Sequence, residues 1–176
     1  MYEWSDEHLM LQQAMRDFVA KEILPIKEEL EHGDLPPYDV LRKLYSTFGM
    51  DEMARSTFAK RIAHEKAVAA GEPVEEKPSR HGGGDAGYTL IPIIELCRHC
   101  PGMVTAMGVS VGLTASAIQA KGTIAQKERW VPELLTLEKV GAWAITEPNS
   151  GSDAFGSMLS TARRDGDEYV LNGSKT

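Results

Sequence analysis

The sequence predicts an α+β fold, in which a mainly helical N-terminal domain precedes the first strands of a β-barrel-like domain. Apolar residues recur at helical spacing through most of residues 1–140. From residue 141 to residue 176 the pattern changes to short runs rich in β-formers, separated by turn residues. So few strands would leave unpaired edges, which proteins normally cover, so we expect the β-domain to be truncated.

The helices of the first domain carry start and stop signals. The first helix should begin after Ser5, a favourable N-cap, and be bent or interrupted at Pro25. Its apolar face follows i, i+4, i+7, i+8 spacing and comprises Leu11, Met15, Phe18 and Val19. Further helices are expected over residues 38–48, 51–70, 88–99, 104–120 and 124–137, with Thr123 capping the last. Residues 71–87 should form a long irregular connection.

Three strands are expected in the second domain, over residues 141–146, 157–164 and 167–172. Asp165-Gly166 between the last two is a strong signal for a two-residue hairpin loop.

The composition excludes several classes of protein. A formal net charge of -7 argues against binding to nucleic acid, which needs a basic face. The two cysteines, Cys97 and Cys100, are too few for a disulfide framework, so we expect a cytoplasmic protein. Their C-x-x-C spacing could mark a redox motif, but Cys97 comes at the end of an expected helix rather than at its start, which favours packing cysteines.

Residues 102–120 carry no charged side chain and include the G-x-x-x-G pattern from Gly108 to Gly112. This length approaches the ~20 residues of a transmembrane helix, and the pattern can mark packed membrane helices. The segment is, however, diluted by Thr105, Ser110, Thr114, Ser116 and Gln119. We therefore expect a buried helix and no integral membrane segment.

The most informative segment is residues 141–153. Trp143 offers an aromatic surface and Thr146 a hydroxyl, and Pro148 then favours an extended chain before a turn. That turn can expose consecutive backbone N–H groups near Gly151, to which Ser152 adds a hydroxyl donor. This combination suits a flat heteroaromatic ligand that carries a pyrophosphate. A strand and turn without a ligand explains the same residues equally well.

The chain resembles the acyl-CoA dehydrogenase family in a series of motifs at matching spacing: Thr146-Glu147-Pro148, Gly151-Ser152-Asp153, Thr161-Ala162, Asp165-Gly166, Tyr169 to Gly173, and Lys175. Upstream, Gly122-Thr123 with residues 126–134, and His81-Gly82-Gly83-Gly84 with residues 95–98, are also similar to the family. The His-Gly-Gly-Gly string also matches the oxyanion loop of some esterases, but no G-x-S-x-G elbow accompanies it.

The resemblance implies FAD as the cofactor. Trp143, Ile145 and Thr146 would lie along the flavin ring, with Thr146 bonding its pyrimidine edge. Gly151 and Ser152 would lie at the pyrophosphate and ribityl region, and Ser152 would also contact the CoA part of the substrate. The helix over residues 104–120 would line the acyl pocket.

The reaction implied is α,β-dehydrogenation of an acyl-CoA thioester in fatty acid metabolism, by a homo-oligomer such as a homotetramer. Electrons would pass to an electron-transfer flavoprotein. The catalytic base would lie beyond Thr176, so no catalytic residue is assigned and residues 1–176 alone should be inactive.

The chain departs from the family pattern in three places: His81, Asn149-Ser150 and the long stretch over residues 51–77. Because that stretch is longer than the family pattern, we expect the pocket entrance to differ. A related oxidase acting on acyl-CoA or nitroalkanes is one alternative. A non-catalytic short subunit that completes a flavin site with a partner chain is another.

Overall fold

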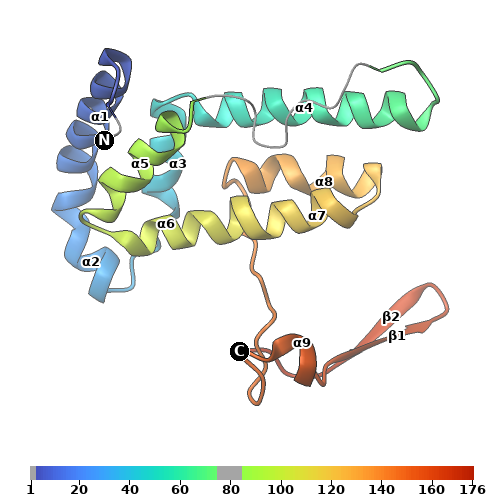
Figure 1. Cartoon of the computed structure of the whole chain (residues 1–176). Coiled ribbons are helices and arrows are strands. Elements are labelled where there is room, and N and C mark those ends of the chain that lie inside the picture. Colours follow the sequence, from blue (N-terminus) through green and yellow to red (C-terminus); the bar gives the residue numbers. More distant parts are fainter. Residues whose placement is uncertain (1–2, 75–84) are drawn as a thin grey trace. The chain divides into compact units, whose positions relative to one another are not determined.

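A computed structural model of the chain describes residues 3–74 and 85–176 (Figure 1). The chain divides into two compact units, Met1–Gly141 and Ala142–Thr176. The first unit is helical and the second contains the strands, so the expected α+β class is confirmed.

In its described residues, the first unit is a succession of helices. Most of the connection expected over residues 71–87 lies outside the described residues. Two π-helical segments, η1 and η3, and one 3-10 segment, η2, interrupt the α-helices. In chain order the elements are α1 Asp6–Phe18, η1 Val19–Ile23, η2 Leu24–Ile26, α2 Lys27–His32, α3 Tyr38–Thr47, α4 Met50–Ala69, α5 Gly87–Cys97, α6 Pro101–Met107, η3 Gly108–Thr114, α7 Ala115–Lys121 and α8 Ile124–Leu135.

Two of the expected helix starts are confirmed in detail. Ser5 caps α1 by a capping box in which its hydroxyl accepts the His8 N–H and the His8 ring accepts the Ser5 N–H. Thr123 caps α8 in the same way with Gln126. Each box satisfies backbone donors that the first helical turn leaves without partners.

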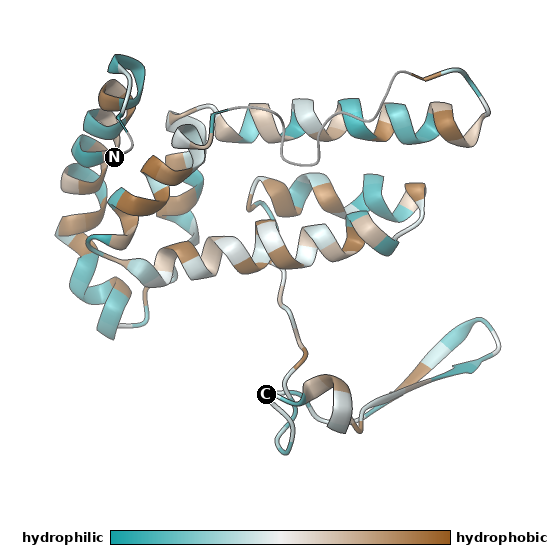
Figure 2. Cartoon of the chain, viewed as in Figure 1, coloured by the Kyte–Doolittle hydropathy of each residue, from teal (hydrophilic) through white to brown (hydrophobic). Residues whose placement is uncertain are grey.

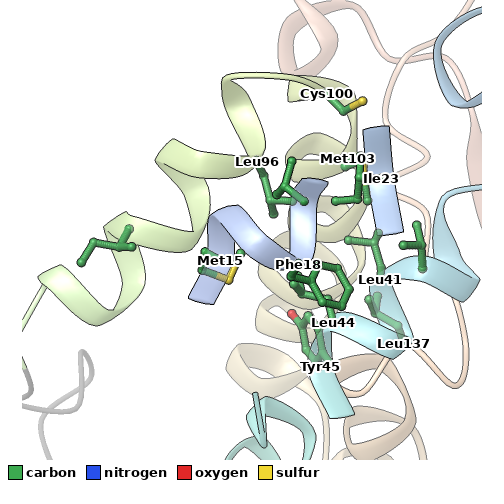
Figure 3. Packing of buried hydrophobic residues seen from close by; sticks show 13 residues of the cluster. Met15, Phe18, Ile23, Leu41, Leu44, Tyr45, Leu96, Cys100, Met103 and Leu137 are labelled. Carbon is green, nitrogen blue, oxygen red and sulfur yellow. The ribbon is translucent and has the colours of Figure 1, made fainter. Parts of the chain in front are cut away.

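The larger hydrophobic cluster brings α1, η1, α3, α5 and α6 together (Figure 3). Met15, Phe18 and Val19 are buried as the spacing predicts, and Leu11 packs against the cluster at its margin. Cys100 is buried here, whereas Cys97 is exposed, so the interpretation as packing cysteines holds for Cys100 and is wrong for Cys97.

A second, smaller cluster holds α4 against α7 and α8. Its buried members are Phe58, Ile62, Ala115, Val131 and Leu134. Helix α4 runs alongside α8 (Figure 1), and two ion pairs join them, Lys66 with Glu128 and Lys127 with Glu65. These pairs fix the register of the two helices across the edge of the small core.

Elements α6, η3 and α7 form one continuous helical segment, Pro101–Lys121, that is long and apolar enough to cross a membrane by length and composition alone. Its expected burial is wrong for this chain: only 17% of the apolar window is buried. Hydrophobic and neutral residues alternate along it (Figure 2), and the buried residues are Met103, Ser110 and Ala115. The absence of an integral membrane segment therefore stays a prediction.

The second unit contains a short helix, α9 Ala154–Ser157, and one hairpin. Strands β1 Thr161–Asp165 and β2 Glu168–Asn172 pair antiparallel, with Asp165 opposite Glu168. Gly166 adopts a left-handed φ of 62° in the loop between them, so the predicted hairpin is confirmed. Part of the strand expected over residues 157–164 is wrong because α9 extends to Ser157 and β1 begins at Thr161.

The strand expected over residues 141–146 is wrong. No ladder pairs with this segment in the part of the chain that the structure describes. Its backbone instead makes a local bond from the Ile145 N–H to the Trp143 carbonyl, and the Thr146 carbonyl accepts from the Thr176 N–H. A β-forming sequence becomes a strand only beside a hydrogen-bonding neighbour, which local patterning cannot supply.

Leu137 holds the chain in place just after the end of α8. Leu137 is fully buried in the larger cluster although its φ of 59° lies in the left-handed region. Its carbonyl accepts a hydrogen bond of 2.7 Å from Arg42 Nε. Burial of the side chain thus offsets a backbone conformation that costs an L-residue about 1–2 kcal/mol.

Leu137→Ala is expected to lower the free energy of unfolding by about 2–5 kcal/mol, because it removes a fully buried side chain from a packed core. Leu35→Ala, at a side chain that is 41% exposed in a loop, should cost about 0.5 kcal/mol or less. Urea denaturation of both variants measures the difference. Equal midpoints for the two variants would contradict the packing described.

Candidate functional site

The residues predicted to hold the cofactor lie together at the start of the second unit. Thr146 and Gly151 are adjacent, because a Cβ built on Gly151 would lie 4.0 Å from Thr146 Cγ2. Trp143, Thr146, Gly151 and Ser152 are exposed, and Ile145 is half-buried. These side chains are therefore available to a ligand rather than used in a core.

A tight turn separates Thr146 from Gly151. The Glu147 N–H donates to the Ser150 carbonyl at 2.8 Å, and the Ser150 N–H donates back to the Glu147 carbonyl at 3.0 Å. The buried Ser150 hydroxyl also donates to the Asp153 carbonyl at 3.0 Å. The turn is closed by its own backbone, which brings the residues on either side of it close together.

The Glu147 carboxylate holds this turn to the rest of the unit. It is 6% exposed and accepts hydrogen bonds from the Leu159 N–H (2.7 Å), the Ser160 N–H (3.0 Å) and Lys175 Nζ (2.9 Å). Hydrogen bonding from Ser160, the Leu159 N–H and Lys175 lowers the pKa of Glu147 to about 2. Such a weak base is a poor acceptor for a substrate proton.

Residues at the C-terminal end of the chain complete the support. Lys175 Nζ also donates to the Ile145 carbonyl at 3.2 Å, and the Thr176 N–H donates to the Thr146 carbonyl at 2.9 Å. Gly173 makes this return possible, since its φ is 153° and a Cβ there would lie 2.8 Å from Ser160 Cα. The segment that carries Ile145 and Thr146 is thus held by side chain and backbone together.

Beyond the turn, the backbone offers hydrogen-bond donors. Among the described residues, none accepts a hydrogen bond from the N–H groups of Gly151 and Ser152, both of which are exposed. The Ser152 hydroxyl lies on the same stretch, directly before α9. Successive N–H groups of this kind form a concavity that suits an anion.

The roles of Glu147 and Lys175 were missed by the sequence reasoning, which placed Glu147 in the turn motif and gave Lys175 no function. Both residues stand at motif positions in the sequence. Their hydrogen bond joins residues 28 apart in the chain and is visible only in the folded structure. His81 and the glycines after it lie outside the described residues. Within the described ranges, no group of three or more His, Cys, Asp or Glu side chains could hold a metal ion.

The pH dependence of the turn follows from Glu147. Its pKa is about 2 in the folded protein against an ordinary value of 4.5, so its stabilising contribution is complete above about pH 4.5 and is lost as pH falls towards 2. Amide exchange protection at Leu159 and Ser160, corrected for intrinsic rates, should fall over this range. Glu147→Gln should already have low protection at pH 6 and lose this dependence.

Glu168→Gln, on the exposed hairpin, is the matched control and should keep the wild-type profile. An unchanged profile in Glu147→Gln would show that the carboxylate does not hold the turn.

Comparison with known proteins identifies the first unit. Residues 47–138, slightly more than half of the chain, match the family model described as "Acyl-CoA dehydrogenase, N-terminal domain". The chain is 32% identical over 173 residues to the mitochondrial short-chain specific acyl-CoA dehydrogenase of Rattus norvegicus, covering 98% of this chain and 37% of that protein.

Solved structures extend the similarity across both units. The glutaryl-coenzyme A dehydrogenase complex with glutaryl-CoA superposes with a TM-score of 0.67 at 30% identity, covering 100% of this chain and 40% of the other. An acyl-CoA dehydrogenase from Bacillus anthracis, in complex with FAD, gives 0.61 at 30% identity, covering 98% and 26%. The chain thus spans well under half the length of these relatives. With its helical N-terminal domain and the motif-bearing turn that follows, it belongs to the acyl-CoA dehydrogenase family.

Proposed function

We propose that this chain supplies the N-terminal domain and part of the flavin site of an FAD-dependent enzyme that dehydrogenates acyl-CoA thioesters. The observation that carries the proposal is the turn anchored by Glu147. It places the Thr146 side chain beside Gly151 and leaves the Gly151 and Ser152 N–H groups without acceptors among the described residues. A hydroxyl that can bond a ring edge, next to N–H groups that can bind an anion, fits an isoalloxazine linked to a pyrophosphate.

The residues fit FAD in their chemistry. FAD, when bound, supplies the electron acceptor for removal of hydrogen from the acyl β-carbon. Thr146 would hydrogen-bond the pyrimidine edge of the flavin, and the exposed Trp143 and half-buried Ile145 would cover its ring system. Gly151 and Ser152 would bind the pyrophosphate and ribityl region, with Ser152 also touching the CoA moiety.

The proton from the α-carbon needs a separate acceptor. Glu147 is unsuited to this task, since its pKa of about 2 and its three donors keep it ionised and engaged. We propose that the base lies in a part of the parent enzyme outside residues 1–176, as the family resemblance implies, and that residues 1–176 alone do not turn over substrate. The sparsely buried segment Pro101–Lys121 would line the acyl pocket, which explains its many small residues.

The proposal also includes the electron acceptor, the pathway, the oligomeric state and the compartment of the enzyme. An electron-transfer flavoprotein is the proposed oxidant of the reduced enzyme, which acts in fatty acid metabolism as a homo-oligomer, with a homotetramer as the working model. The cytoplasm is the proposed compartment.

The activity is tested on the full-length protein with butyryl-CoA, a short-chain probe chosen because relatives are named short-chain specific. We expect reduction of a ferricenium-type acceptor and slow reoxidation of the reduced flavin by oxygen. Fast reoxidation by oxygen would favour an oxidase instead. A requirement for a second, different polypeptide would favour the non-catalytic subunit.

Thr146→Val and Ser152→Ala are each expected to weaken FAD binding by about three- to tenfold, the effect of losing one hydrogen bond. Fluorescence titration of the full-length apoprotein with FAD measures this. Thr161→Val, at an equally exposed threonine in β1, is the matched control and should bind like wild type. Wild-type affinity in both site variants would contradict the assignment of the turn.

A further inference from the structure

The first unit ends at Gly141, and this end is fixed to the helix Pro101–Lys121 by one hydroxyl. Ser110 is fully buried, and its Oγ accepts a hydrogen bond of 3.0 Å from the Gly141 N–H. The O–H of the same hydroxyl donates to the Lys139 carbonyl at 3.5 Å. A single buried side chain therefore satisfies two backbone groups of the connection that leads to residue 142.

Close packing at Gly141 reinforces this attachment. A Cβ at this position would lie 2.6 Å from Thr114 Cγ2, 2.9 Å from Thr114 Cβ and 3.0 Å from Leu134 Cδ2. The backbone of Gly141 is thus pressed between η3 and α8 at a distance that no other residue type allows without movement of its neighbours.

The helix is irregular at this same place. Ser110 and Thr114 both belong to η3, a π-helical segment inside a longer helix. Such insertions weaken regular helix geometry and are frequent at functional sites. Here the insertion carries Ser110 and Thr114, two of the side chains that lie against Gly141, so the irregular turn and the attachment coincide.

The attachment limits where the next residues can go. Two residues of extended chain span at most about 7 Å, so the Cα of Trp143 stays within that distance of Gly141. Trp143 is the first of the residues that the proposed function assigns to the flavin. The short segment that leads to Trp143 therefore starts from a backbone position that Ser110 and the packing at Gly141 hold in the first unit.

We infer that Ser110 and Gly141 form a positioning pair for the flavin site, an inference that rests on the proposed function. The Ser110 hydroxyl holds the Gly141 N–H, and so fixes the starting point of the segment that presents Trp143, Ile145 and Thr146 to FAD. Neither residue touches the flavin in this account. Loss of the hydroxyl frees the backbone at residues 139–141 and lets the flavin-contacting segment leave its place.

The test is Ser110→Ala in the full-length protein, with two controls. Ser46→Ala removes an exposed hydroxyl from α3, outside the segments assigned to the cofactor and the substrate. Ile23→Val trims a fully buried side chain in the larger cluster, away from Gly141, and serves as a control for loss of stability alone. FAD affinity, the visible circular dichroism of the flavin at saturation, kcat and KM for butyryl-CoA, and Tm are measured for all four proteins.

We expect Ser110→Ala to weaken FAD binding by about three- to tenfold, to alter the flavin circular dichroism at saturating FAD and to lower kcat more than it raises KM. Ile23→Val should lower Tm but leave the flavin signals unchanged, and Ser46→Ala should match wild type in all of them. If Ser110→Ala lowers Tm and behaves like Ile23→Val in every flavin signal, the hydroxyl is merely structural and the inference is overturned.

Gly141→Ala keeps the test valid if Ser110→Ala does not fold. Its added methyl group must push the backbone away from Thr114, so the same change in flavin circular dichroism is expected with the Ser110 hydroxyl intact. Normal flavin signals in Gly141→Ala would also overturn the inference. A wild-type protein that binds no FAD would instead refute the proposed function itself, before any variant is compared.

Discussion

The buried carboxylate of Glu147 is the interaction on which the second unit depends. Within the described part of residues 142–176, the buried residues are Glu147, Ser150 and Ala154, so hardly any hydrophobic core is available there. An ionised carboxylate that is largely removed from water must be compensated by donors, and here they come from Leu159, Ser160 and Lys175. The turn, the segment before β1 and Lys175 all meet at this carboxylate, and the bonds from Lys175 to Ile145 and from Thr176 to Thr146 add to the attachment of the C-terminal residues.

The first unit is held together by a different kind of interaction. Two hydrophobic clusters hold its helices, yet Pro101–Lys121 leaves most of its apolar window exposed within this chain. The chain covers 37% of its Rattus norvegicus relative and 40% of the glutaryl-CoA dehydrogenase structure. What the helix does supply here is a fixed attachment at Ser110, whose buried hydroxyl bonds the Lys139 carbonyl and the Gly141 N–H.

Local features were predictable from the sequence and distant pairings were not. The caps at Ser5 and Thr123 and the left-handed Gly166 depend on residues within one turn, so their patterns are legible. A strand over residues 141–146 needed a neighbour that the sequence cannot name, and the expectation failed. The site motif could be located by resemblance, and its exposed residues do lie together. The links from Glu147 to Lys175 and from Ser110 to Gly141 join residues about 30 apart, and only folding reveals them.

If the turn over residues 146–153 belongs to a site for a flavin nucleotide, the full-length protein binds flavin, and the amount of bound flavin tests this most directly. The full-length protein, incubated with FAD and separated from free cofactor by gel filtration, should retain flavin absorbance equivalent to one FAD per chain. A folded full-length protein that stays colourless after this treatment would contradict the account.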